Sequence, residues 1–266
     1  MQRVFITGAS SGLGQALARH YAASGARLGL LARRDAALVA LCASLPNAEL
    51  HRIYPVDVND HAALAAAATD FIDTAGGIEI VIANAGVSYG TLTEHREDLR
   101  VFEQIMATNV TAMVATFAPF IASMRCQAAA GQTDLRLVGI ASVAGIRGLP
   151  GAEAYSASKA AVISYCESLR IELRRDRIRV VTIAPGYIDT PMTQVNTYAM
   201  PFLLPPEQFA LRAARVIAAG RSYAVIPWQM RGVSWLLRLL PNWLYDVLFS
   251  RAPQKPRLRD QADPPA

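Results

Sequence analysis

The chain has little lysine, cysteine and histidine. Of its 26 basic residues only Lys159 and Lys255 are lysines, and the arginines are scattered rather than clustered. Scattered arginines are typical of solvated faces, so we expect no nucleic-acid partner. The three cysteines lack C-x-x-C spacing, which predicts reduced thiols in a cytoplasmic protein. The four histidines have no metal-ligand spacing, so we expect no metal site.

A leader and a long apolar run are also missing. The chain begins MQRVFITG, which predicts a strand rather than a secretory signal. No apolar run is expected to reach the length of a membrane span. What the chain does have is 53% apolar and 18% charged residues among 266, the composition of a globular protein with a substantial core.

Short apolar runs alternate with alanine-rich segments that have helical periodicity. Most of the runs are apolar throughout, as in strands that are buried on both faces. The alternation predicts the α/β class: a Rossmann-like, doubly wound, seven-stranded parallel sheet with helices on both faces. The expected strands are 3–8, 27–32, 50–56, 78–86, 135–142, 179–186 and 223–227, and the expected helices are 12–24, 35–45, 60–75, 97–127, 153–176 and 206–219.

The end of the chain sets the domain organisation. We expect a nucleotide-binding domain over 1–230, an apolar helical extension over 231–250 and a flexible tail over 251–266, which is rich in proline and charge. Pro241 should divide the extension into two short helices. Tryptophan and leucine alternate with arginine along 231–251. Such a segment can pack on the domain, form a homo-oligomer interface or lie on the inner face of a membrane, and the sequence leaves these open.

The stretch TGASSGLG, residues 7–14, predicts a dinucleotide site. It follows the first strand and opens the first helix, which is where dinucleotides bind in such sheets. Gly8, Gly12 and Gly14 allow the backbone to approach a pyrophosphate at the helix N-terminus.

The end of the second strand predicts which dinucleotide is bound. The sequence there is LLARRD, with Arg33 and Arg34 where an NAD site usually has a carboxylate. Two guanidiniums suit a 2′-phosphate, and Ser10 can add a hydroxyl contact. We therefore expect NADP(H) in preference to NAD(H).

A tyrosine and a lysine in AYSASKAAV, residues 154–162, predict a proton-transfer site. Tyr155 and Lys159 are four residues apart, so on a helix their side chains share a face. An unperturbed tyrosine has a pKa near ~10, too high for ready proton exchange at neutral pH. We expect the Lys159 ammonium to lower the pKa of Tyr155, which would then act as general acid and base. The alternative is an exposed helix pair with a solvated ammonium.

With these motifs the chain resembles the short-chain dehydrogenase/reductase family over about residues 3–227. ANAG at 83–86 matches the family's NNAG, with alanine in place of the first asparagine. The resemblance implies an oxidoreductase that transfers a hydride between NADP(H) and a carbonyl or alcohol group. The further matches are Asp57 in YPVDV, Asn109 in MATNVTA, Ser142 in GIASVAG, and PGYIDTPM at 185–192.

The resemblance also assigns site residues. The catalytic set is Asn109, Ser142, Tyr155 and Lys159. Ser142 would donate a hydrogen bond to the substrate oxygen. Lys159 would bond the nicotinamide ribose, and Asn109 would kink its helix and hold a water. The cofactor-binding set is Gly8, Ser10, Ser11, Gly12, Leu13, Gly14, Arg33, Arg34, Asp57, Val58, Asn84, Ala85, Gly86, Tyr155, Lys159, Pro185, Gly186, Ile188 and Thr190.

Several of these residues have a purely structural alternative. Ser142 can cap the end of a strand, Asn109 can bond backbone inside a helix, and Asp57 can cap the helix that begins near residue 59. For the whole protein, one alternative is a non-catalytic nucleotide-binding regulator on the same fold. Another is an epimerase or dehydratase, but the chain is short after its last strand for the sugar-nucleotide subdomain of those enzymes.

Residues 187–206, YIDTPMTQVNTYAMPFLLPP, bear on the substrate. The segment is long and apolar, which is typical either of a lid that closes over substrate or of ordinary packing on the domain. As a lid it favours a hydrophobic carbonyl or alcohol compound that is lipid-like, steroid-like or aromatic. No charged residue in the segment stands out as an anchor for an acidic substrate.

Overall fold

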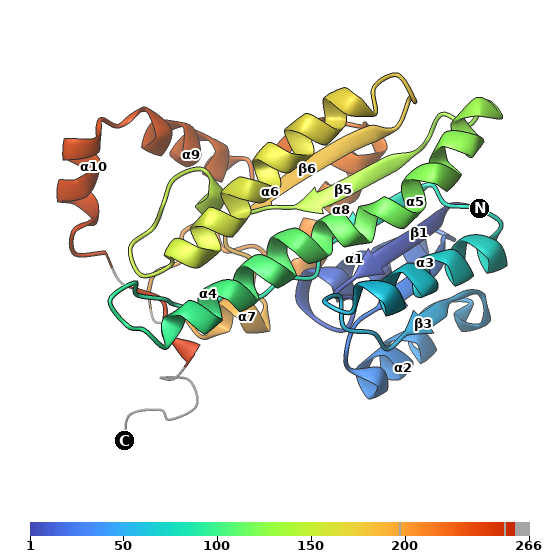
Figure 1. The fold of residues 1–266 in the computed structure, drawn as a ribbon, viewed down its shortest axis with the longest axis horizontal. Helices are drawn as coiled ribbons and strands as arrows, with labels where there is room; N and C mark the ends of the chain where they lie inside the picture. The colour runs from blue at the N-terminus through green and yellow to red at the C-terminus, as the bar shows by residue number, and fades with distance from the viewer. Residues whose placement is uncertain (197, 253, 259–266) are drawn as a thin grey trace.

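The computed structural model describes residues 1–196, 198–252 and 254–258, and they form one α/β domain (Figure 1). The sheet has seven parallel strands in the order β3-β2-β1-β4-β5-β6-β7. The predicted fold class is therefore confirmed. The strands are β1 (Arg3–Thr7), β2 (Arg27–Leu31), β3 (Arg52–Tyr54), β4 (Ile80–Ala83), β5 (Arg136–Ile140), β6 (Arg179–Pro185) and β7 (Tyr223–Ile226).

Most of the described helices lie where helical periodicity predicts them, with one long segment subdivided, but a short helix at 191–194 lies where no helix was predicted. They are α1 (Gly12–Ala23), α2 (Asp35–Ala43), α3 (His61–Ala75), α4 (Asp98–Met106), α5 (Ala112–Ala129), α6 (Glu153–Glu172), α7 (Pro191–Gln194), α8 (Pro206–Ala218), α9 (Gln229–Leu239) and α10 (Asn242–Phe249). Short 3-10 turns occur at η1 (Ala48–Leu50) and η3 (Val143–Gly145), and a π-helical turn at η2 (Ala107–Thr111).

Two apolar layers cover the two faces of the sheet. Alternate strand residues point to opposite faces, so Val4 and Ile6 belong to one buried cluster and Phe5 to the other. The first cluster contains side chains of α1, α2 and α8, and the second contains side chains of α3, α5 and α6. Burial on both faces explains why the strands are apolar throughout.

The strand order reverses direction between β1 and β4. The chain first builds β1, β2 and β3 outward on one side, and then returns to place β4 on the other side of β1. In open parallel sheets a ligand crevice forms outside the carboxyl ends of the strands at this switch point. The fold therefore sets the place of a binding site before any side chain is considered.

The segment Asp98–Ala129 is a continuous helical run made of α4, η2 and α5. By length and composition it could cross a membrane, which corrects the expectation that no apolar run is long enough. Its side chains Met113, Phe117 and Phe120 are buried in the core cluster next to α3 and α6. In this structure the run is therefore a core helix of the domain.

Helices α9 and α10 form an arm that projects from the body of the domain (Figure 1). Pro241 lies between the two helices, as predicted. The arm is attached to the loop before α6: Arg147 donates to the Leu237 carbonyl, and its guanidinium lies 3.9 Å from the centroid of the Tyr245 ring. The Tyr245 hydroxyl donates to the Gly148 carbonyl at 2.6 Å.

The described part of the predicted tail is packed rather than free. Residues 254–258 run beside the loop that follows β4, where the Gly90 N–H donates to the Pro256 carbonyl at 3.0 Å. The Arg257 guanidinium pairs with Asp98 at the start of α4. The predicted flexibility over 251–266 stays a prediction, and residues 253 and 259–266 lie outside the described part of the chain.

Candidate functional site

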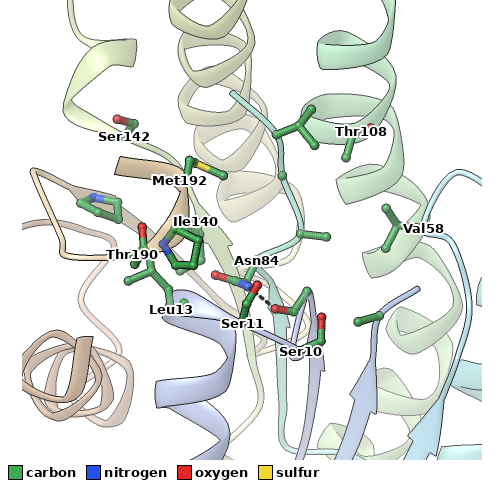
Figure 2. Close-up of a pocket in the computed structure, with 18 of the residues that line it drawn as sticks. Ser10, Ser11, Leu13, Val58, Asn84, Thr108, Ile140, Ser142, Thr190 and Met192 are labelled. Carbon is green, nitrogen blue, oxygen red and sulfur yellow. Dashed lines mark hydrogen bonds between the residues drawn. The ribbon is translucent and has the colours of Figure 1, made fainter. Parts of the chain in front are cut away.

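A cavity of about 300 Å³ opens at the carboxyl ends of the central strands. Figure 2 shows Ser142, Thr190 and Met192 toward one side of it and Ser10 and Val58 toward the other. The cavity wall contains every residue of the predicted cofactor set except Gly14, together with Ser142. The topology thus brings together residues that are up to 182 positions apart, from Gly8 to Thr190.

The glycine turn between β1 and α1 has the geometry that its sequence predicts. Gly8 and Gly12 have φ of +67° and +53°, in the left-handed region that favours glycine. A Cβ at Gly14 would clash with the Gly8 carbonyl oxygen. Glycine at position 14 therefore lets the first turn of α1 pack directly against the loop at Gly8. Ser11 is the N-cap of α1, but no side chain caps the first N–H groups of that helix.

Thr7 and Asn84 join the ends of β1 and β4. The Thr7 hydroxyl accepts the N–H groups of Asn84 and Ala85, each at 3.1 Å. The Asn84 amide in turn donates to the carbonyls of Thr7 and Gly8 at 2.9 and 3.3 Å. Asn84 therefore holds the glycine turn in place, whereas the sequence predicted only that it binds the cofactor. Thr7, which bonds Asn84, was not predicted as a site residue.

Two arginines form the rim of the cavity after β2. Arg34 donates to the hydroxyl and the carbonyl of Ser10 at 3.1 and 3.3 Å. Arg33 is mostly exposed, and its guanidinium lies 3.9 Å from Asp57. Among the described wall residues Asp57 is the one carboxylate, and it accepts the N–H and side-chain amide of Asn59. The helix-capping alternative for Asp57 is wrong, because Asp60 is the N-cap of α3 and accepts the Ala63 N–H.

Tyr155 and Lys159 lie on the face of α6 that is turned toward the cavity. The Lys159 ammonium lies 5.7 Å from the Tyr155 ring centroid, so the expected proximity is confirmed. The ammonium is buried and donates to the carbonyl of Ile140, the last residue of β5, at 2.9 Å. Burial lowers the pKa of Lys159 to about 8, because a desolvated ammonium favours its neutral form.

The pKa of Tyr155 moves in the direction opposite to the expected one. Burial raises it, because a phenolate is poorly solvated in the protein, and a hydrogen bond with Ser142 lowers it by less. Lys159 is not among the causes of the shift, since its ammonium is directed to the Ile140 carbonyl. The expectation that Lys159 lowers the pKa of Tyr155 is therefore wrong for this structure.

Ser142 and Asn109 both make the structural contacts that the sequence left as alternatives. Ser142 follows β5 and accepts the Ala144 N–H at 3.1 Å, while it also lies on the cavity wall. Asn109 lies outside the wall, within the π-helical turn η2. Its amide bonds both the N–H and the carbonyl of Val87, at 2.8 and 3.0 Å, and donates to Ser158.

Ten wall residues were not predicted. Most of them directly precede or follow a predicted residue at the end of a strand. This adjacency was the feature of the sequence that could have predicted them. They are Ala32, Val56, Asn59, Val87, Thr108, Ile140, Ala141, Pro191, Met192 and Thr193. Thr193 also forms a reciprocal capping box with Thr190, which fixes the start of α7 at the cavity. Among described residues no cluster of His, Cys, Asp or Glu could hold a metal ion.

Residues 2–200 match the family model described as short chain dehydrogenase. The chain belongs to the short-chain dehydrogenase family. An uncharacterized oxidoreductase of Myxococcus xanthus is 36% identical over 248 residues, which cover 92% of this chain and 95% of the relative. This short-chain dehydrogenase is therefore an oxidoreductase of the nicotinamide-dependent type.

Solved structures agree with this assignment. A 3-ketoacyl-(acyl-carrier-protein) reductase from Brucella melitensis, complexed with NADH, has a TM-score of 0.77 and 26% identity, with 85% of this chain and 96% of that chain covered. The Pseudomonas aeruginosa RhlG/NADP complex has a TM-score of 0.74 and 25% identity, with 85% and 95% covered. Both forms of the dinucleotide thus occur among the neighbours.

The lowered pKa of Lys159 predicts the alkaline limit of carbonyl reduction. Above a pH of about 8 the ammonium loses its proton, whereas Tyr155, whose pKa is raised, keeps its own. The kcat/KM for the reduced nicotinamide dinucleotide reports pKa values of the free enzyme, so it should fall above about pH 8. In Lys159→Arg the guanidinium stays protonated, so any remaining activity should not fall above this pH. A fall in kcat/KM at the same pH in both proteins would show that Lys159 is not the group that titrates.

Proposed function

We propose that this chain is an NADP(H)-dependent oxidoreductase that interconverts a carbonyl and an alcohol group on a hydrophobic substrate. The observation that carries the proposal is the meeting of Ser142, Tyr155 and Lys159 at one end of the cavity whose other walls are the glycine turn and Arg33–Arg34. A regulator without turnover would not need a buried lysine and tyrosine on the wall of a nucleotide cavity.

The cavity fits a dinucleotide with a 2′-phosphate. The uncapped N-terminus of α1 offers free N–H groups and a partial positive charge for a pyrophosphate. Close packing of Gly14 on Gly8 keeps that helix end against the turn. Arg34 is already bonded to Ser10, so one guanidinium and one hydroxyl are placed together beside the mostly exposed Arg33. These groups support NADP(H) over NAD(H).

The side chains divide the chemistry of reduction among them. The bound cofactor supplies the hydride. Ser142 donates a hydrogen bond to the substrate oxygen, and Tyr155 gives that oxygen its proton. The raised pKa of Tyr155 keeps the phenol in the donor form at neutral pH. The Lys159 ammonium donates one N–H to the Ile140 carbonyl, and its further N–H groups would bond the ribose of the bound cofactor.

The segment 187–204 supports a hydrophobic substrate. Its base is closed by hydrogen bonds between Tyr187 and Leu204 and between Asp189 and Leu204, each at 3.0 Å. Burial, together with nearby Tyr187 and Tyr155, raises the pKa of Tyr198 to about 12, so the segment passes close to the proposed proton donor. Met192 lies on the cavity wall. An apolar lid pinned at its base fits these contacts.

We also propose that the arm α9–α10 contacts an anionic membrane surface. All three tryptophans of the chain are exposed there or just before it: Trp228, Trp235 and Trp243 are 74%, 67% and 69% exposed. Residues 229–251 carry three arginines and one carboxylate, a balance that suits anionic lipid. The predicted homo-oligomer, for which the same surface could serve, stays a prediction.

The proton-transfer assignment is tested by Tyr155→Phe. The change removes one hydroxyl from the cavity wall, so NADPH binding should stay within about twofold, while NADPH-dependent ketone reduction should fall by about 10²–10⁴-fold. Steady-state rates on a panel of ketones and a fluorescence titration with NADPH measure the two effects. Unchanged turnover would defeat the assignment, and turnover absent from the parent protein on every ketone would favour the regulator.

The cofactor preference is tested by Arg33→Ala and Arg34→Ala, singly and together. Loss of charge-assisted hydrogen bonds to a 2′-phosphate should weaken NADPH binding by roughly 10- to 100-fold for the pair, with NADH binding nearly unchanged. Arg221→Ala, an exposed arginine outside the cavity wall, is the matched control. An equal loss for both dinucleotides would show that neither arginine recognises the phosphate.

Membrane contact is tested by co-sedimentation with liposomes that contain anionic phospholipid. Trp235→Asn combined with Trp243→Asn removes two large apolar contacts and should lower the bound fraction by about tenfold or more. Ile171→Asn, which changes an equally exposed residue on α6, is the control and should leave binding unchanged. If the double variant binds as well as the parent, the arm is not the contact.

A further inference from the structure

The strap, residues 254–258, lies across three segments that surround the substrate end of the cavity. Its backbone pairs with Gly90 in the loop after β4. A Cβ at Gly151, two residues before α6, would lie 2.8 Å from Gln254. The Lys255 ammonium donates to the Met192 carbonyl in the lid segment at 3.2 Å. Because α6 carries Tyr155, the strap touches the segments on which the proposed chemistry depends.

The strap is fastened at one end by a buried ion pair. The Arg257 guanidinium donates through two nitrogens to the two carboxylate oxygens of Asp98, at 2.8 and 2.9 Å, and also bonds Glu97. Asp98 is buried, and this forked geometry is the strongest form of an arginine–carboxylate pair. The pair leaves the backbone before it, including Lys255, little freedom to move.

The Lys255 ammonium is the unusual group in the strap. It donates to the Ser88 hydroxyl at 3.0 Å and to the Met192 carbonyl, which are both neutral acceptors. Burial lowers its pKa to about 8, and no neighbouring acid opposes that shift. The strap's other charged group is Arg257, which pairs with Asp98 at the start of α4 and with Glu97 just before it. Helix α4 also carries Arg100 and Glu103. Among the described residues no carboxylate balances the Lys255 charge.

An ammonium that is partly buried without a counter-charge is unfavourable unless a ligand supplies one. Lys255 is placed where a substrate could do so. It lies beside the cavity wall rather than on it: its acceptor Met192 is on the wall, and its acceptor Ser88 directly follows the wall residue Val87. An ammonium has three N–H donors, and in the described part of the chain Lys255 uses two of them. One donor remains for an anionic oxygen.

We propose that Lys255 is the anion-recognition residue of the substrate cavity, so that the substrate is an apolar carbonyl or alcohol compound with a carboxylate or phosphate at its far end. This inference rests on the proposed oxidoreductase function. It refines the hydrophobic substrate expected from 187–206: the lid covers the apolar part, and the anchor comes from a segment 63 residues further along the chain than Met192.

Three ketones of the same chain length test the proposal: a carboxylic acid, its methyl ester and the corresponding phosphate monoester. The parent protein should prefer one or both anionic ketones. Lys255→Gln keeps a polar side chain without charge, and it should raise KM and lower kcat/KM for the preferred anion by roughly 10- to 100-fold. Its kcat/KM for the ester should stay within about twofold. Lys255→Arg should restore part of the preference, and Gln254→Ala is the control.

The outcomes separate the anion site from the oxidoreductase function. The anion whose kcat/KM falls in Lys255→Gln identifies the class. Equal losses on ester and anions, or a parent protein without charge preference, would overturn the role of Lys255 while the function stands. If the parent reduces none of the three, the function fails, and calorimetric binding of the same compounds then decides the anion site. Tighter binding of an anion than of the ester, lost in Lys255→Gln, supports it, and equal binding overturns it.

A pH series gives a second readout that Lys159 cannot imitate. Lys159 acts on both substrates, so its effect cancels in the ratio of kcat/KM for the preferred anion to kcat/KM for the ester. Because the pKa of Lys255 is lowered to about 8, the ratio should fall above that pH as the ammonium is lost. In Lys255→Gln the ratio should be low and independent of pH. A ratio that is flat in the parent protein would contradict the proposal.

Discussion

The hydrogen bond from the Lys159 ammonium to the Ile140 carbonyl connects the helix that carries Tyr155 with the strand that precedes Ser142. The bond is made inside the protein, where burying an ammonium is unfavourable unless it is hydrogen-bonded. In these surroundings of low dielectric constant a hydrogen bond is also stronger than in water. The bond fixes α6 against the carboxyl end of β5, so the tyrosine and serine that would contact a substrate oxygen keep a constant separation. Losing it would disturb geometry and charge at once, which is why no other side chain can replace Lys159 without cost.

The π-helical turn at Asn109 stabilises the same arrangement from the opposite side. Inserting one residue into a helix turns the Asn109 amide toward the loop after β4, where it bonds both backbone groups of Val87. The same amide donates to Ser158, whose hydroxyl donates to the Tyr155 carbonyl at 2.7 Å. A chain of hydrogen bonds therefore runs from one cavity wall, through a helix irregularity, to the helix of the proton donor. Such irregularities frequently mark functional sites.

The sequence predicts what depends on local pattern. Continuous apolar runs predict the strands, and the glycines after β1 and the i, i+4 pair on α6 predict residues of the cavity wall. It does not predict quantities that depend on surroundings. The direction of the Tyr155 shift is set by burial and by where the Lys159 ammonium points, and neither is visible in AYSASKAAV. The tail was predicted to be flexible because it is rich in proline and charge, and that composition does not reveal partners such as Asp98, 159 residues away from Arg257.

The contrast between arginine and lysine explains the distribution of positive charge. A guanidinium keeps its proton and suits exposed or forked contacts, whereas an ammonium is compact and its pKa falls readily on burial. The exposed rim and the strap's fastening use arginine, as at Arg33 and Arg257, whereas Lys159 is buried on the cavity wall and Lys255 is partly buried beside it, each with its pKa lowered to about 8. Both positions therefore place a titratable charge where burial strengthens its hydrogen bonds to oxygen acceptors. An enzyme that holds its cofactor and proton donor at one end of a substrate, and an anion at the other, would need this choice at both places.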